Sequence, residues 1–251
     1  MEARDERHQS QGHDSHPQAS AHSHDRQWSD ETFVGGWTQR EEANLAALRP
    51  QLAKVRSLIP KGPTEPFRYV DLGAGVGYLD ELILDRFTGA HAVLIDGSAP
   101  LLALAQKRLQ RYAGRVQFVQ ADLSGQQWVE QVRGSFDAVV SARALHHLGG
   151  AARIRELFAE VLGTLTPGGL FINLDYVRLS NAVLQPLGLW AMTDPDSDFQ
   201  TVSPPMELTG SMEEQLAWLR EAGFSAAECV FREFQTAILV SLRDQVCWPT
   251  A

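Results

Sequence analysis

The sequence has little cysteine, no long apolar run and no basic cluster, and each of these absences excludes a class of protein. The 251 residues include two cysteines, Cys229 and Cys247, which are too few for a disulfide framework and lack the paired spacing of a zinc site. No run of about 18 apolar residues is present to form a transmembrane helix. Residues 1–32 also lack the apolar stretch that a secretory signal needs. We therefore expect a soluble, cytoplasmic protein without a metal centre.

The formal net charge of −9 at pH 7 is spread unevenly along the chain. Residues 1–32 hold three arginines and seven acidic residues, so they account for −4, and the rest of the chain carries −5. An acidic chain without a basic stripe lacks the electrostatic footprint of a nucleic-acid-binding protein. It is also poorly suited to an anionic membrane surface. Neither nucleic acid nor membrane is therefore an expected partner.

Residues 1–27 are predicted to form a disordered tail, because only four of them are apolar and they cannot bury enough surface to offset the entropy of folding. Weak metal binding is the alternative role, since histidine-rich tracts bind metals. The tail holds five of the eight histidines of the chain: His8, His13, His16, His22 and His24.

A helical cap is predicted over residues 28–60, ahead of a linker rich in proline and glycine. Thr38, followed three residues later by Glu41, matches the pattern of a capping box at a helix start. Pro50 removes a backbone donor from the apolar pattern that follows. The helix is therefore expected to break near Arg49, with the proline at the start of a second helix.

From residue 67 onward, short apolar runs alternate with amphipathic stretches, which predicts βαβ units and a parallel sheet. The expected strands cover 68–72, 92–96, 116–121, 138–141 and 170–174, and the expected helices lie around 78–87, 99–112, 125–132 and 151–165.

The end of the chain departs from this alternation. After a helix near 212–222, two β-like runs at 227–234 and 236–242 follow with almost nothing between them, so they must be antiparallel. The segment at 176–211 is long for a connection and is predicted to cover the substrate. We expect a single domain over 28–251, with its core at 67–243.

The most informative motif is a glycine-rich turn between the first strand and the next helix. It reads Tyr69-Val-Asp-Leu-Gly-Ala-Gly-Val-Gly-Tyr78. Glycines let a ligand approach the backbone, and the following helix offers free amide groups at its N-terminus. The spacing fits neither the Gly-x-Gly-x-x-Gly dinucleotide fingerprint nor a Walker loop, which ends in Gly-Lys-Ser/Thr.

This turn resembles the first motif of class I S-adenosylmethionine-dependent methyltransferases. The resemblance implies an α/β, Rossmann-like fold with a seven-stranded, mostly parallel sheet in the order 3-2-1-4-5-7-6, strand 7 antiparallel, helices on both faces and an N-terminal helical lid. It also implies that S-adenosylmethionine is the cofactor. The methionine part of the cofactor would then be surrounded by Asp71, Gly73, Ala74, Gly75 and Gly77.

Two further carboxylates stand where the resemblance places the nucleoside of the cofactor. Asp96 ends the second strand, 19 residues beyond Gly77, and with Gly97 would hold the ribose hydroxyls. Asp122 follows the third strand and, beside Leu123, would accept a hydrogen bond from the adenine amino group. Capping of the next helix is the alternative role for each carboxylate.

The segment after the fourth strand supplies the candidate catalytic residues. The resemblance places Ser141 and Arg143 near the sulfur of the cofactor. His146 or His147 is a candidate general base, since histidine titrates near neutral pH. Adjacent side chains rarely point the same way, so at most one of the two is expected to be catalytic. Local packing is the alternative for both.

Two other patterns carry less weight. Trp28, Phe33 and Trp37 are candidates for an aromatic lid over the substrate, with ordinary packing of the cap as the alternative. The acidic run from Asp194 to Asp198 matches the start of a calcium loop. It lacks the glycine and the glutamate that should follow, so a solvated loop is favoured.

These observations predict an enzyme that transfers a methyl group from S-adenosylmethionine to an oxygen, nitrogen or carbon atom of a small molecule. In-line positioning of the reactants would supply most of the rate. The alternatives are a non-catalytic S-adenosylmethionine-binding module and an RNA methyltransferase.

Overall fold

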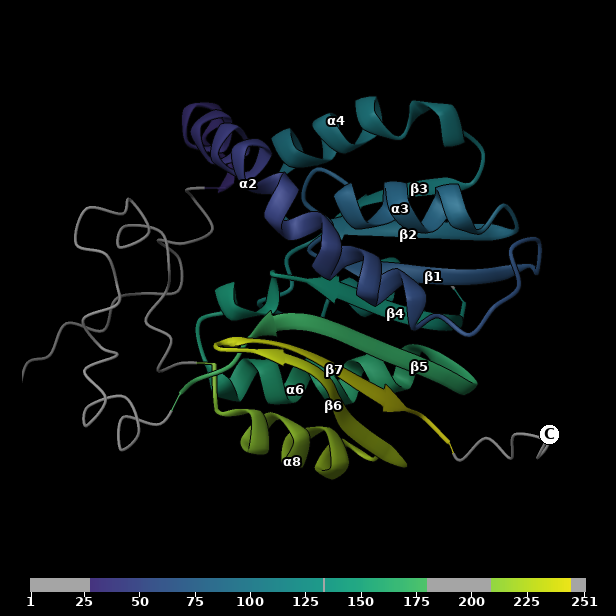
Figure 1. Ribbon diagram of the computed structural model, residues 1–251, viewed down its shortest axis with the longest axis vertical. Helices are drawn as coiled ribbons and strands as arrows, with labels where there is room; N and C mark the ends of the chain where they lie inside the picture. The colour runs from purple at the N-terminus through teal and green to yellow at the C-terminus, as the bar shows by residue number, and fades with distance from the viewer. Residues whose placement is uncertain (1–27, 133, 180–208, 245–251) are drawn as a thin grey trace, which may run out of the picture.

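The computed structural model describes residues 28–132, 134–179 and 209–244. Within these ranges, seven strands form one sheet in the order β3-β2-β1-β4-β5-β7-β6 (Figure 1). The first five strands pair in parallel, and β7 is antiparallel to both β5 and β6. The predicted strand order and its antiparallel seventh strand are therefore confirmed. The strands are β1 (Phe67–Leu72), β2 (Ala90–Asp96), β3 (Val116–Gln120), β4 (Phe136–Ala142), β5 (Leu165–Tyr176), β6 (Ala226–Glu233) and β7 (Thr236–Leu242).

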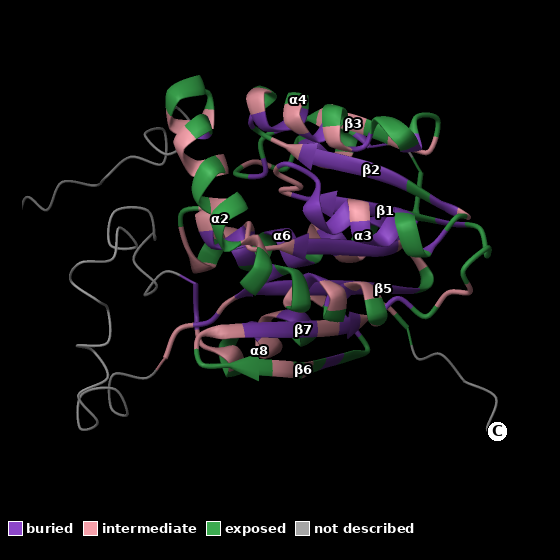
Figure 2. Cartoon of the chain, turned by 45° about the horizontal axis from the view of Figure 1, so that its top comes forward, coloured by how far each residue is buried: buried purple, intermediate pink, exposed green. Residues whose placement is uncertain are grey.

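Helices cover both faces of the sheet and bury a separate apolar cluster on each. On one face α2 (Glu31–Ser57), α3 (Tyr78–Arg86) and α4 (Ala99–Arg108) pack against the strands. The other face is covered by α5 (Trp128–Gln131), α6 (Ala151–Thr164) and α8 (Met212–Ala222). Figure 2 shows the central strands as largely buried and the outer helix surfaces as exposed. Short 3-10 turns, η1 (Gln110–Tyr112) and η2 (Leu145–His147), follow α4 and β4.

The start of α2 differs from the sequence prediction. Asp30 caps the helix, and its carboxylate accepts hydrogen bonds from two backbone amides of the first turn, at 2.8 and 3.0 Å. Thr38 lies inside the helix and donates its hydroxyl to the carbonyl of Val34. The capping box predicted at Thr38 and Glu41 is therefore wrong.

The predicted break near Arg49 is wrong as well, because α2 continues through Pro50. A proline inside a helix leaves the carbonyl four residues earlier without its amide donor. That carbonyl belongs to Ala46, and both Ala46 and Pro50 are exposed, so water can satisfy it. Buried side chains on both sides of the proline hold the helix on the sheet: Val34, Leu48, Leu52 and Val55.

The strand order creates a switch point between β1 and β4. The chain leaves β1 toward β2 and leaves β4 toward β5, on opposite sides. Ligands of open α/β sheets bind outside the carboxyl ends of the strands at such a point. No helix among the described residues is both long enough and apolar enough to cross a membrane.

Some predicted features lie outside the described residues. They are the tail at 1–27, most of the segment at 176–211, the acidic run at 194–198 and Cys247.

Candidate active site

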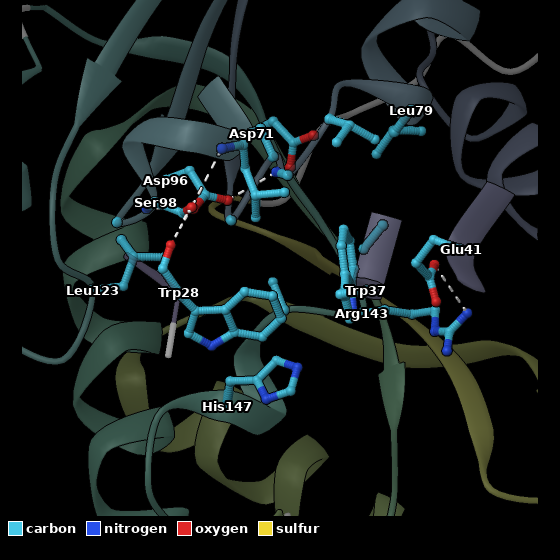
Figure 3. Close-up of a pocket in the computed structure, with 18 of the residues that line it drawn as sticks. Trp28, Trp37, Glu41, Asp71, Leu79, Asp96, Ser98, Leu123, Arg143 and His147 are labelled. Atoms are coloured by element: carbon cyan, nitrogen blue, oxygen red, sulfur yellow. Dashed lines mark hydrogen bonds and ion pairs between the residues drawn. The ribbon is translucent and has the colours of Figure 1, made fainter. Parts of the chain in front are cut away.

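A cavity of about 290 Å³ lies at the switch point, where the loops after β1, β2, β3 and β4 meet α2 (Figure 3). Ten of the predicted site residues line it. Gly77, Ser141 and His146 do not. The predicted residues in the wall are Asp71, Gly73, Ala74, Gly75, Asp96, Gly97, Asp122, Leu123, Arg143 and His147.

The glycine loop presents bare backbone to the cavity. Gly73 has a φ of +72°, and a Cβ there would lie 2.3 Å from the Cβ of Ala144, so no side chain fits. The amides of Gly73 and Ala74 donate to the carbonyl of Ile95 at 2.8 and 3.0 Å, which ties the loop to β2. Gly77, at a φ of +78°, starts α3 behind the loop.

Asp96 joins the glycine loop to the turn after β2. One carboxylate oxygen accepts the amide of Gly75 and the other accepts the amide of Ser98, both at 2.8 Å. Burial raises the pKa of Asp96, and the two amide bonds oppose that rise. Asp96 does not cap α4, which was its alternative role. Ser98 caps that helix instead, because its hydroxyl accepts the amide of Leu101.

Two buried carboxylates, Asp71 and Asp80, lie together under the glycine loop. The hydroxyl of Tyr69 donates to one oxygen of Asp80 at 2.9 Å. Burial, followed by the charge of Asp80, raises the pKa of Asp71 well above its usual value. Burial raises the pKa of Asp80 to about 6. Oδ1 of Asp71 and Oδ2 of Asp80 are both buried without a separate donor among the described residues, and a proton shared between the two carboxyl groups accounts for both atoms.

Asp122 forms the turn after β3. Its two oxygens accept the amide and the hydroxyl of Ser124, at 2.7 and 2.5 Å. Because α5 begins only at Trp128, Asp122 does not cap it. The turn places Leu123 and Ser124 in the cavity wall beside the aspartate.

His146 and His147 stand in different environments. The ring of His147 lines the cavity, 5.3 Å from the ring of Trp28. The buried His146 has its Nδ1 2.6 Å from Oδ1 of Asp175, and its amide donates to the other oxygen at 3.0 Å. The two imidazole rings are 3.9 Å apart. His147 therefore faces the ligand space, and His146 supports it from behind.

The electrostatics around Asp175 keep it ionised. Burial alone would raise the pKa of this carboxyl. The charge and the hydrogen bond of His146, with the amide of Tyr176, hold the pKa below its usual value instead.

Aromatic side chains at the start of the cap complete the wall. Trp28 and Trp37 line the cavity with their rings 5.4 Å apart (Figure 3). Phe33 packs edge-on against Trp28, with the ring centroids 5.2 Å apart. The carbonyl of Trp28 accepts the hydroxyl of Ser98 at 2.5 Å, which ties the cap to the start of α4.

A charged pair in the cavity wall joins the cap to the segment after β4. Nη1 of Arg143 lies 3.7 Å from Oε2 of Glu41 (Figure 3). Arg143 adopts a left-handed φ of 57°, which is rare outside glycine and is found at functional sites. Its guanidinium also lies 5.4 Å from the ring of Tyr176.

Sequence reasoning missed several residues of this site, among them Glu41 and Asp175. Asp175 lies near the carboxyl end of β5, as Asp71 does in β1, so the rule that strand ends meet at one edge was sufficient to find it. Glu41 gave no such signal, because its spacing from Thr38 matched a helix cap. Among the described residues, no group of three or more His, Cys, Asp or Glu side chains is arranged to hold a metal ion.

Residues 70–171 match the family model of the methyltransferase domain. The chain is 36% identical over 105 residues to trans-aconitate 2-methyltransferase of Acidovorax sp. strain JS42, covering 42% of this chain and 36% of the relative. It is 30% identical over 111 residues to demethylmenaquinone methyltransferase of Thermus thermophilus, covering 44% of this chain and 48% of the relative. The matches therefore span less than half the length of either relative.

The fold has a counterpart among solved structures. An O-methyltransferase family protein from Burkholderia thailandensis superposes with a TM-score of 0.67 at 20% identity, over 86% of this chain and 61% of that chain. The sheet and the cavity at its switch point define a Rossmann-like methyltransferase fold. With the family match over residues 70–171, these features resemble those of class I S-adenosylmethionine-dependent methyltransferases. S-adenosylmethionine is the cofactor of this class.

Proposed function

We propose that this chain transfers a methyl group from S-adenosylmethionine to an oxygen, nitrogen or carbon atom of a small molecule. The observation that carries the proposal is one cavity that joins the glycine loop and Asp96 to an aromatic wall, with His147 beside it. When bound, S-adenosylmethionine supplies an electrophilic methyl group on a sulfonium. The protein then has to hold the acceptor in line, close and free of water, which is a matter of positioning.

The residues of the wall fit the chemical groups of this cofactor. Asp71 in the cavity wall is the proposed partner of the ammonium group, and Asp96 with Gly97 suits ribose hydroxyls. Asp122 and Leu123 form the proposed adenine end. Arg143 is the proposed partner of the methionine end.

Two predicted residues outside the wall are proposed to act indirectly. Ser141 is buried and donates its hydroxyl to the carbonyl of Leu72 at 2.8 Å, which fixes the end of β1 where the glycine loop begins. Gly77 starts α3 on the other side of that loop.

His147 is the proposed general base, because its ring lines the cavity and that of His146 does not. The base accepts the acceptor's proton at a ring nitrogen when the acceptor is a protonated oxygen or nitrogen. Asp175 and His146 are proposed as positioning residues. They support the ring of His147 through the 2.6 Å contact between Asp175 and His146 and through the close approach of the two imidazole rings.

A small acceptor is favoured over a nucleic acid. Trans-aconitate and demethylmenaquinone, named in the relatives, are small molecules. In this chain, the guanidinium of Arg143 in the cavity wall is paired with Glu41. A nucleic-acid backbone would need cationic side chains that are not already paired. The cytoplasmic location stays a prediction from the sequence.

Cofactor binding tests the first half of the proposal. Calorimetric titration with S-adenosylmethionine is expected to give one site per chain. Asp96→Ala removes the bonds to Gly75 and to the ribose, so affinity should fall about tenfold to a hundredfold. Glu228→Gln, which changes an exposed acid of β6, serves as the control and should bind like the wild type. Unchanged affinity in Asp96→Ala would contradict the cofactor assignment.

Turnover tests the second half. A metabolite library is incubated with the protein and cofactor, and S-adenosylhomocysteine formation is followed by mass spectrometry. With an acceptor found, His147→Ala is expected to lower kcat and leave the Kd for the cofactor unchanged. A protein that binds the cofactor but gives no product with any acceptor would instead be a binding module.

A further inference from the structure

The loop at the Asp122 end of the cavity is held from behind by Arg153 of α6. Nε of Arg153 donates to the carbonyl of Leu123 at 2.8 Å, and Nη2 donates to the carbonyl of Gly125 at 2.9 Å. Three residues of this loop, 122–124, line the cavity, and Arg153 does not. The arginine therefore touches the wall only from its outer side.

Arg153 is itself fixed in place by Glu160, two turns further along α6. The guanidinium makes two short bonds to the carboxylate, Nη1 to Oε1 at 2.6 Å and Nη2 to Oε2 at 2.7 Å. Both side chains are 11% exposed. Oε2 of Glu160 also accepts the indole N–H of the buried Trp128 at 2.6 Å.

The geometry gives this pair a directional role. A guanidinium is planar, so pairing its Nη1–Nη2 edge with Glu160 fixes the plane in which its other edge, Nε with Nη2, points. Nε and Nη2 point at the two loop carbonyls, and Nη1 also lies 3.5 Å from the exposed Glu156. The two carbonyls are partly buried, and both of their donors belong to one side chain that is fixed on α6. The loop is therefore held to α6 at two points.

We propose that Arg153 is a positioning residue for the adenine end of the cofactor site, holding the loop 122–125 in the conformation that the nucleoside binds. The inference rests on the proposed function, which assigns that loop to adenine. Without the two bonds from Arg153, only a fraction of the molecules has the loop in the binding conformation. The apparent affinity for the cofactor is then reduced in proportion to that fraction. Because adenine is common to all forms of the cofactor, the loss is shared by every adenosine-containing ligand.

The test uses the full chain and a double variant, Arg153→Met with Glu160→Gln. This pair leaves no buried charge without a partner, and the glutamine still accepts the indole N–H of Trp128. The Kd values of S-adenosylmethionine and of adenosine are both expected to rise about tenfold, with the binding stoichiometry unchanged. In a turnover assay, KM for the cofactor should rise by the same factor while kcat stays unchanged, because His147 lies outside the loop.

Two single variants complete the design. Arg155→Met is the matched control, since Arg155 lies on the same helix, is 59% exposed and pairs with Glu221, and it should bind like the wild type. Arg153→Lys keeps the charge beside Glu160 but cannot hold both carbonyls, so adenosine binding should weaken here too. It is also the fallback if the double variant does not fold.

The outcomes separate the two proposals. Wild-type affinity for adenosine in a folded Arg153 variant overturns the positioning role and leaves the proposed function intact. Failure of the wild-type protein to bind S-adenosylmethionine or adenosine overturns the proposed function itself.

Discussion

Asp80 lies under the glycine loop with one oxygen bonded to Tyr69 and with a pKa that burial raises to about 6. Its folded-state pKa therefore lies above the value of 3.8 that an exposed aspartate has. The folded protein holds the proton more tightly than the unfolded chain does. The resulting stability is present below the lower pKa and is lost as the pH rises through the higher one.

Asp80→Asn is expected to stabilise the protein at pH 8 by about 1–3 kcal/mol, and to give little gain at pH 4, which lies close to the unfolded-state pKa of 3.8, so that little of the stability has yet been lost. The amide oxygen still accepts the bond from Tyr69, and no charge is buried. Urea unfolding at the two pH values measures the difference. The exposed Glu228→Gln should show no such pH dependence, and an equal gain at both pH values for Asp80→Asn would contradict the argument.

At the scale of single residues, the sequence predicts site residues that directly follow strands. It does not reveal residues whose role depends on burial. Asp96 was found because it ends an apolar run after the glycines. Asp80 was not, because an acid in the first turn of a helix is ordinary at an exposed position. Its burial between α3 and the sheet is set by tertiary packing.

At the scale of elements, α2 carries an avoidable cost at Pro50. The residue is exposed and outside the cavity wall, and the carbonyl of Ala46 lacks a helical donor. Pro50→Ala restores that donor and so stabilises the helix. Alanine also gives the unfolded chain more conformational freedom than proline does, which lowers the free energy of unfolding by about 0.4–1 kcal/mol. A net gain of about 1–2 kcal/mol in the free energy of unfolding is expected.

Urea unfolding checks this gain, and titration with S-adenosylmethionine checks that affinity is unchanged. A loss of stability in Pro50→Ala would mean that the proline shapes α2 rather than being tolerated by it. Gln51→Ala, a neighbouring substitution in the same helix that adds no backbone donor, serves as the control.

The strands and the presence of a helical cap were predictable, but the continuity of α2 through Pro50 was not. The core strands are buried, so each one is visible in the sequence as a short apolar run bounded by turn residues. In α2, the local proline signal competes with Leu48, Leu52 and Val55 packing against the sheet. Most helical stability in proteins comes from such packing, and here it overrides the local signal.

At the scale of the whole molecule, the cap and the core form one cavity wall. Trp28 contributes its ring to the wall and its carbonyl to Ser98, and Asp30 caps α2 two residues later. The folded domain is therefore predicted to need the chain from Trp28 onward. Residues 1–27, which carry five histidines, are proposed to be a tail that the domain does not need.

Two truncations place this boundary. Removal of residues 1–27 is expected to leave the thermal midpoint and the Kd for S-adenosylmethionine unchanged. Removal of residues 1–30 takes away Trp28, which lines the cavity, and Asp30, the N-cap residue of α2. The domain should therefore lose about 1–2 kcal/mol of stability and bind the cofactor more weakly. Calorimetry of both proteins, with and without cofactor, measures these differences. If the shorter truncation alone lowered stability or affinity, the tail would belong to the folded domain. If removal of residues 1–30 changed neither stability nor affinity, Trp28 would not be part of the cofactor site.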